Sequence, residues 1–435
     1  MTGPNRLGQR AAIGLAAAVT LPAVALRLTG THPAPVAGAV LFGGAVVGAA
    51  FLMAWGAEAL QVDVSRGLAL AVLALIAVLP EYAVDFTFAF KAGADPHRYA
   101  PLALANMTGA NRLLIGVGWA LVVLLAAWRI RNIARRRGYA GTVDTDVRLD
   151  RPHAVEIAFL AVATLYSLSL ALKRRLTLFD AVILVGLFVV YMVRVSRAPA
   201  EEPDLIGPSE LLGRLPTKQR RLATGAVLGA AAAVIIVSAE PFAESLVASG
   251  SELGVSKFLL VQWLAPLASE SPELIVAALF ALRLNTNAGL GTLVASKVNQ
   301  WTLLVGTLPI VFVIAGGSSR GLPLDSLQRE ELFLTAAQSV FAVAVLASRS
   351  IDVREALLLF GLFIGQFVLG GVLPADVRHW ERISVAVVYM VLATIMLIAQ
   401  RRSIPPLLRD GFRTPVADLI HEDSSVASGT DAGAP

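Results

Sequence analysis

The chain has 435 residues, of which 56% are hydrophobic and 15% are charged, and its mean hydropathy is +0.71. This composition excludes an ordinary soluble domain and is typical of a membrane protein with many spanning helices. The net charge of +5 does not indicate a nucleic-acid partner, because the arginines flank apolar segments, where the positive-inside rule accounts for them. The sequence contains no cysteine, which excludes disulfides and thiolate chemistry and leaves the oxygen donors that hard cations prefer.

Roughly twelve segments are long and apolar enough to cross a bilayer, since each crossing takes about 20 residues as a helix. The first, at about 11–28, has the length of a signal peptide, but we expect it to remain as a membrane helix. The first half continues with predicted helices at 36–60, 67–91, 101–127, 153–172 and 177–195. After a polar linker, the second half has predicted helices at 221–248, 255–283, 288–315, 331–348, 354–372 and 382–400.

The distribution of basic residues determines the expected orientation. If the first helix is retained and the N-terminus is cytoplasmic, the basic loops around Arg135 and Arg220 and the tail after Arg401 all face the cytoplasm, as the positive-inside rule requires. The short basic turn at Lys173 is the exception. We therefore predict a multi-pass protein of the plasma (inner) membrane with both termini cytoplasmic.

Two corresponding helices, one in each half, carry carboxylates inside apolar segments. Each contains a Pro-Glu pair, ending at Glu81 in the first half and at Glu273 in the second. Asp85 and Glu270 lie one turn away on the same helix faces. A carboxylate near the bilayer centre costs roughly 2.5 to 3.5 kcal/mol on insertion scales, so such residues usually mark an ion or proton path. The alternatives are a surface acid near Lys91 for Asp85 and a capping or ion-pair residue for Glu270.

The helix after each Pro-Glu helix opens with small residues and amides. The first copy contains Asn106 and Asn111, and the second contains Ser296, Lys297 and Gln300. Five spans separate equivalent points, so the two copies enter the membrane from opposite sides. This is an inverted-topology repeat, in which transporters place the substrate site near the midplane. The amides could instead form hydrogen bonds that hold helices together.

These features predict an all-α polytopic fold of two inverted five-helix repeats with one extra helix at each end. The expected divisions are an extra helix at 1–35, the first repeat at 36–195, a cytoplasmic linker at 196–220, the second repeat at 221–372, an extra helix at 373–409 and a disordered tail at 410–435.

At these residues the sequence resembles the sodium/calcium exchanger family of the cation/calcium antiporter superfamily. The family motif Gly-Thr-Ser-x-Pro-Glu corresponds here to Ala-Val-Leu-Pro-Glu at 77–81 and to Ser-Glu-Ser-Pro-Glu at 269–273. The second motif, Gly-Asn-x-x-Gly-Ser-Asn-x-x-Asn, corresponds to the amide clusters. The resemblance implies a central site between the two Pro-Glu helices, with Glu81 and Glu273 as paired calcium ligands. Ser269 belongs to the same motif and is a further ion-binding candidate.

The sequence departs from the family pattern on the third helix of each repeat. The family's serine and asparagine ligands correspond to Ala110 and Leu114 in the first half, which carry no ligating oxygen, and to Ser296 and Gln300 in the second half, which do. The symmetric set of sodium ligands is therefore incomplete. Lys297 replaces a family asparagine, so its ammonium either fills a place that sodium would occupy or neutralises Glu270.

We predict a secondary antiporter that exchanges calcium or a related cation against sodium or protons by alternating access. No cofactor, enzyme activity or nucleic-acid partner is expected, and the partners are inorganic cations and the lipid bilayer. No His-Glu-x-x-His zinc motif and no phosphate-binding glycine loop is present. The alternatives are a monovalent cation/proton antiporter on the same scaffold and a non-transporting membrane protein. The sequence does not indicate an oligomeric state.

Overall fold

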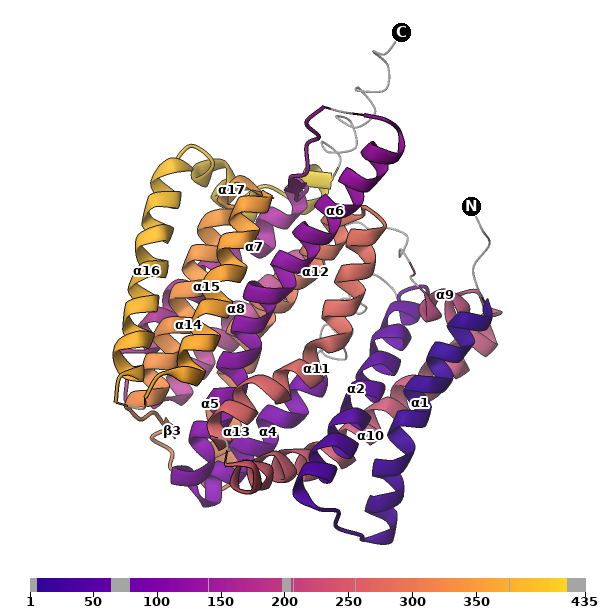
Figure 1. Ribbon diagram of the computed structural model, residues 1–435, viewed down its shortest axis with the longest axis vertical. Helices are drawn as coiled ribbons and strands as arrows, with labels where there is room; N and C mark the ends of the chain where they lie inside the picture. Colours follow the sequence, from indigo (N-terminus) through magenta and orange to yellow (C-terminus); the bar gives the residue numbers. More distant parts are fainter. Residues whose placement is uncertain are drawn as a thin grey trace. The chain divides into compact units, whose positions relative to one another are not determined.

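The computed structural model describes residues 6–63, 79–139, 141–197, 205, 207–254, 256–374 and 376–420 (Figure 1). Within this part of the chain, eleven helical segments are long and apolar enough to cross a membrane. This confirms the prediction of an all-α polytopic membrane protein. The first part of the predicted helix at 67–91 lies outside the described residues, which resume at α4 (Leu79–Ala94).

The helices of the first half are α1 (Arg6–Thr29), α2 (Pro35–Leu60), α4, α5 (Pro96–Leu113), α6 (Ala120–Arg136), α7 (Ala154–Leu170) and α8 (Leu178–Val195). Those of the second half are α9 (Pro208–Gly213), α10 (Thr217–Leu253), α11 (Lys257–Leu282), α12 (Thr286–Asn299), α13 (Val305–Ile314), α14 (Ser326–Val345), α15 (Val353–Val372), α16 (Arg378–Ala399) and α17 (Ile404–Phe412). The predicted linker at 196–220 therefore contains the short helix α9 and the first residues of α10.

Both halves contain a π-helical segment at the same place. The segment η1 (Leu114–Trp119) joins α5 to α6, and η3 (Gln300–Leu304) joins α12 to α13. The first segment follows the amide cluster of its half, and the second begins at Gln300, the last residue of its cluster. Single π-helical turns are rare and occur frequently at functional sites. These segments could not be predicted from the apolar pattern, because nearly all their residues are buried and no exposed face marks the change of helical phase.

The chain forms two compact units, and each unit combines segments from both halves. Unit 1 comprises residues 1–110, 199–273 and 311–318, and unit 2 comprises 111–198, 274–310 and 319–435. The predicted repeats at 36–195 and 221–372 therefore do not correspond to separate compact bodies. Three of the boundaries fall inside helices: in α5 after Ala110, in α11 after Glu273 and in α13 after Ile310.

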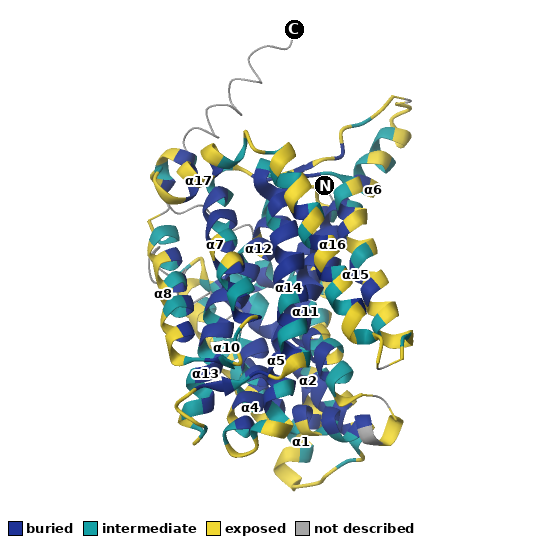
Figure 2. Ribbon diagram, turned by 90° about the vertical axis from the view of Figure 1, so that its left-hand side faces the viewer, coloured by how far each residue is buried: buried dark blue, intermediate teal, exposed yellow. Residues whose placement is uncertain are grey.

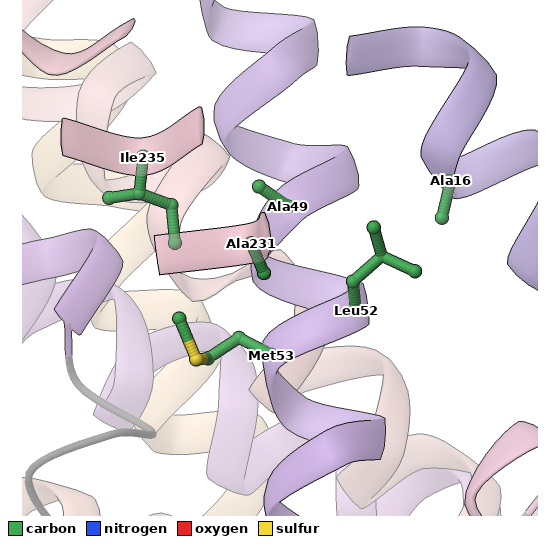
Figure 3. Close-up of a cluster of buried hydrophobic side chains, with 6 residues drawn as sticks. All are labelled: Ala16, Ala49, Leu52, Met53, Ala231 and Ile235. Carbon is green, nitrogen blue, oxygen red and sulfur yellow. The ribbon is translucent and has the colours of Figure 1, made fainter. Parts of the chain in front are cut away.

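Unit 1 is built around the contact of α2 with α10, and α1 packs against both. Its core cluster takes Ala16 from α1, three residues from α2 and two from α10, with Leu52, Met53 and Ile235 as the largest side chains (Figure 3). Gly48 allows the close approach, since a β-carbon there would lie 2.5 Å from the carbonyl oxygen of Ala16. The first helix is thus packed into unit 1, and its retention as a membrane helix stays a prediction.

Gly109 provides the closest helix contact in unit 1 and leads to a first prediction. A β-carbon on this residue of α5 would lie 1.7 Å from the carbonyl oxygen of Gln262 in α11. Gly109→Ala is expected to destabilise the protein by about 1–3 kcal/mol, because the backbones must separate. The measurement is thermal unfolding in detergent. Gly186→Ala is the control, since nothing lies within 4 Å of that position. Equal melting temperatures for the two variants would contradict the prediction.

A second prediction concerns Asp63, which follows α2 and ties it to the start of α10. Arg220 donates to both carboxylate oxygens of Asp63, at 2.6 and 2.8 Å, and Arg221 donates at 3.0 Å. The hydrogen bonds from Arg220 are the main reason that the pKa of Asp63 falls from 3.8 to about 2.

Because this pKa is lower in the folded than in the unfolded chain, the interaction stabilises fully above about pH 4 and is lost as the pH falls towards about 2. Asp63→Asn is therefore expected to lower the melting temperature at neutral pH. The difference from wild type should narrow between about pH 4 and about pH 2. A difference that stays constant over this range would show that the charge of Asp63 is not what stabilises the contact.

Two short antiparallel ladders in unit 2 join the two halves. Strand β1 (Val147–Arg148), before α7, pairs with β4 (Ser350–Ile351), before α15. Strand β2 (Arg175–Leu176), before α8, pairs with β3 (Leu322–Pro323), before α14. The starts of α7 and α15 therefore lie together, and so do those of α8 and α14. The inverted repeat stays a prediction, and it would let the fourth helix of one half and the fifth of the other enter from the same side.

The outer faces of the unit 2 helices are exposed, as Figure 2 shows along α8 and α16, and many of their exposed side chains are apolar. On α16 the exposed residues include Val387, Val391, Ile395 and Ile398, which recur at helical spacing. Such a stripe is expected of a helix whose outer face contacts lipid tails.

The predicted disordered tail begins too early. Residues 410–420 are folded as part of unit 2, and 421–435 lie outside the described residues. Arg151 forms an ion pair with Asp410 at 2.9 Å, and Arg194 donates to the carbonyl oxygens of Asp410 and Thr414. Leu419 is fully buried. The composition of the segment did not predict these contacts, because the arginines that bind it lie far away in the sequence, in α8 and in the turn before α7.

Candidate functional site

The ten predicted site residues divide between the two units. Unit 1 contains Glu81, Asp85, Asn106, Ser269, Glu270 and Glu273, and unit 2 contains Asn111, Ser296, Lys297 and Gln300. All four predicted carboxylates thus belong to one unit, together with an amide and a hydroxyl. The lysine belongs to the other.

Glu81 and Asp85 lie in the first two turns of α4 and are both buried. Asn106 of α5 donates from Nδ2 to Asp85 Oδ1 at 2.8 Å, and Asn106 is itself fully buried. The second oxygen, Asp85 Oδ2, has no hydrogen-bond partner among the described residues. Buried carboxylate oxygens usually have partners, so this oxygen is available to a proton or a cation.

The alternative interpretation of Asp85, as a surface acid near Lys91, is wrong, because Lys91 binds other acids. Its ammonium lies 3.1 Å from Glu240 and 2.5 Å from Glu244, both on α10. Asp85 is therefore an interior acid paired with an amide, and Lys91 belongs to a separate ion-pair group between the end of α4 and the C-terminal half of α10.

The second Pro-Glu helix is α11, which contains prolines at 266 and 272. Proline removes a backbone hydrogen bond, so it loosens the turn before it and leaves carbonyl groups for other partners. Ser269 donates to the carbonyl oxygens of Ala265 and Pro266, both at 3.3 Å, within that turn. Glu270 is buried, while Glu273 is half-buried with Oε2 inaccessible and without a hydrogen-bond partner among the described residues.

No group of three or more His, Asp or Glu side chains that could hold a metal ion is assembled among the described residues. A bound divalent cation would therefore need carbonyl, amide or hydroxyl oxygens in addition to carboxylates, as calcium sites commonly use. Unit 1 offers Asn106, Ser269 and the carbonyls released by the prolines of α11. A cavity of about 420 Å³ between α2, α10 and α11 is lined almost wholly by apolar groups and contains none of the four acids.

In unit 2, Lys297 of α12 is fully buried and contacts Asn111 of α5. Its ammonium donates to both the backbone oxygen and Oδ1 of Asn111, and it lies 5.5 Å from the ring centroid of Trp301. Gln300 is buried one position before Trp301, and Ser296 is half-buried. The predicted contact of Lys297 with Glu270 or Glu273 stays a prediction, because those acids belong to unit 1.

Unit 2 contains an interior ion pair that the sequence analysis missed. Arg112, next to Asn111, donates to Glu331 of α14 at 2.5 Å and also to Gln366 of α15. All three side chains are buried. Gln338 of α14 donates to the backbone oxygen of Arg112 at 3.4 Å. The available signal was an arginine inside the predicted helix at 101–127, where a charge is expensive and needs a partner.

The chain matches a known protein family. The family model described as sodium/calcium exchanger protein matches residues 34–197 and 224–370. Among curated protein sequences, none matches the chain.

Three solved structures illustrate the similarity. A crystal structure described as the H+/Ca2+ exchanger CAX is 40% identical with a TM-score of 0.85, and the match covers 95% of this chain and 99% of that one. The Ca2+/H+ antiporter protein YfkE is 13% identical with a TM-score of 0.58, covering 88% and 100%. The sodium-calcium exchanger NCX_Mj soaked with 10 mM Na+ and 10 mM Sr2+ is 16% identical with a TM-score of 0.50, covering 76% and 97%. The last two show a shared fold alone. With its family match over most of its length, the chain belongs to the sodium/calcium exchanger protein family.

Proposed function

We propose that this protein is a secondary antiporter that moves calcium across the membrane in exchange for protons, by alternating access. The family comprises exchangers, which are transporters rather than enzymes. The observation that carries the proposal is the set of buried carboxylates in unit 1, since acids inside membrane-length helices are retained for ion paths. The H+/Ca2+ exchanger with 40% identity supports this choice of ions.

Glu81 and Glu273 are the proposed calcium ligands. Calcium takes six to eight oxygen ligands and needs negative charge to replace its hydration shell. The two Pro-Glu helices each supply one of these acids. Asp85, Glu270, Asn106 and Ser269 supply further oxygens in the same unit. Binding and release then favour different conformations, because a ligand shifts an equilibrium through its differential affinity for the two states.

Protons are favoured over sodium as the counter-ion. Ala110 and Leu114 offer no oxygen where the family pattern has sodium ligands, and Lys297 already holds the oxygens of Asn111. In contrast, Asp85 Oδ2 and Glu273 Oε2 are inaccessible oxygens without hydrogen-bond partners in the described part of the chain. A buried carboxylate oxygen usually has a hydrogen-bond partner, so these two oxygens are the proposed binding places of the exchanged protons.

The proposed orientation places both termini in the cytoplasm of a plasma (inner) membrane, with inverted repeats as predicted. The β1–β4 and β2–β3 pairings support the inverted arrangement.

No cofactor is proposed. A Gly-x-Ser-x-Gly pattern at 317–321 lies in the turn between α13 and β3, without the strand-to-helix context of a hydrolase nucleophile, so it gives no support to an enzyme.

The test is calcium flux in proteoliposomes that contain the purified protein. Calcium uptake is expected when the lumen is acidic, and a protonophore should abolish it. A sodium-loaded lumen at equal pH is the comparison. Calcium uptake that is driven by sodium and unaffected by the proton gradient would show that the counter-ion is sodium rather than the proton. Flux of monovalent cations without calcium would favour the monovalent cation/proton antiporter, and no gradient-driven flux would leave a non-transporting membrane protein.

A further inference from the structure

The starting observation is a buried ammonium group inside a membrane-length segment. Lys297 lies within Thr286–Ile314, and none of its surface is exposed. A lysine at such depth is expensive and is retained where its charge has a function or a set of partners. The partners around Nζ include the backbone oxygen and Oδ1 of Asn111 and the face of the Trp301 ring.

These partners are groups of the kind that bind a small monovalent cation. Carbonyl and amide oxygens coordinate hard cations, and the face of an indole ring attracts a cation within about 6 Å of its centroid. The ring is held in place, because Trp301 Nε1 donates to Ser339 of α14 at 2.9 Å. The oxygens and the ring therefore form a preorganised setting for one positive charge.

The position of this contact in the repeat adds a second argument. Asn111 and Lys297 occupy corresponding places in the two amide clusters, and they contact each other. Each lies shortly before a π-helical segment, η1 after Asn111 and η3 after Lys297. The first repeat thus supplies the oxygens, and the second supplies the charge that they bind.

We infer that Asn111 and Trp301 form a monovalent cation site that the ammonium of Lys297 fills as a tethered cation. Removal of the ammonium should therefore create a site for sodium or a small alkylammonium ion. This binding consequence does not depend on calcium transport. Its consequence for transport does rest on the proposed function: one charge of the cycle is supplied by the chain, so fewer counter-ions move per calcium ion.

The primary test is thermal unfolding of purified, full-length Lys297→Ala in detergent. The melting temperature is compared in sodium chloride, ethylammonium chloride and choline chloride at equal ionic strength. Wild type should melt at the same temperature in all three. Lys297→Ala should melt several degrees lower in choline and recover part of that loss with sodium or ethylammonium, because a ligand that binds the folded state stabilises it.

Three control variants separate this effect from general salt effects. Lys297→Met fills the space with an uncharged side chain and should be destabilised without recovery. Asn111→Ala, added to Lys297→Ala, removes the amide oxygen and should abolish the recovery. Lys173→Ala removes a lysine that pairs with Asp180 in the same unit and should show no cation-specific recovery.

Lys297→Asn provides a second route if the alanine variant folds poorly, because its amide can bond to Asn111. Recovery of folded Lys297→Ala only when it is purified in sodium or ethylammonium would also support the site. Identical melting temperatures of Lys297→Ala in all three salts would overturn the proposed cation site. The site would also be overturned if Lys297→Ala failed to fold in every salt and the melting temperature of Lys297→Asn did not depend on sodium.

A transport measurement then separates this inference from the proposed function. The reversal potential of calcium transport in proteoliposomes should differ between wild type and Lys297→Asn if a free cation replaces the tethered one. Sodium-dependent stability with no calcium transport in wild type would uphold the cation site and reject the proposed function. Calcium transport by wild type, together with a Lys297→Ala stability that does not depend on sodium, would uphold the proposed function and reject the cation site.

Discussion

Glu81→Gln and Glu273→Gln are each expected to abolish cation transport and to leave the protein folded in the membrane. Each change removes one negative charge and keeps the volume of the side chain. Calcium affinity depends on the number of charged ligands. A loss of about 3 kcal/mol in binding corresponds to roughly a 100-fold loss of affinity. The measurement is proton-driven calcium uptake in proteoliposomes at matched protein content, with size-exclusion profiles to check the fold.

Glu58→Gln and Glu244→Gln are the matched controls. Glu244 pairs with Lys91, and 58% of its side chain is exposed. Glu58, near the end of α2, accepts a hydrogen bond from Ser209 at 2.5 Å. Both variants should retain most of the activity, which separates the acids of the proposed site from acids that pair elsewhere. Uptake near the wild-type rate in Glu81→Gln or Glu273→Gln would remove that residue from the proposed site.

Arg112→Gln is expected to destabilise the protein by about 3–5 kcal/mol, because it leaves Glu331 as an uncompensated buried charge. The Arg112 and Glu331 side chains are 2% and 6% exposed. Gln366 cannot replace the arginine, since its amide carries no charge. The measurement is chemical or thermal unfolding in detergent, with Glu331→Gln and the double variant completing a mutant cycle.

The control for this prediction is Arg148→Gln, which removes an exposed ion pair in the same unit. Arg148 lies 3.0 Å from Asp144, and the two side chains are 71% and 64% exposed. Such a pair contributes about 0–1 kcal/mol. If Arg112→Gln cost no more than Arg148→Gln, the interior pair would not be a stabilising contact of unit 2.

The sequence by itself determined the class of protein and the places of its acids. A membrane-length apolar segment must form a helix, because the bilayer core offers no water to bond its backbone groups. Hydropathy is a local property, so the spans could be read directly from the chain. Glu81, Asp85 and Glu270 are buried in the structure, as their apolar surroundings predicted.

The sequence did not determine which polar groups meet. Asp85 bonds to Asn106 rather than Lys91, and Lys297 bonds to Asn111. Arg112 finds its partners on α14 and α15, far along the chain. A buried charge indicates that a partner exists, but the identity of that partner depends on which helices are neighbours.

Only the tertiary structure decided the two compact units, the π-helical segments and the folded residues 410–420. Apolar side chains in a membrane gain little by choosing a helix over lipid, so hydropathy does not encode helix neighbours. Close approach at small residues such as Gly48 and Gly109 and the pairing of interior polar groups select them instead. Those contacts join residues that are distant in sequence, and for this reason each unit draws its helices from both halves of the chain.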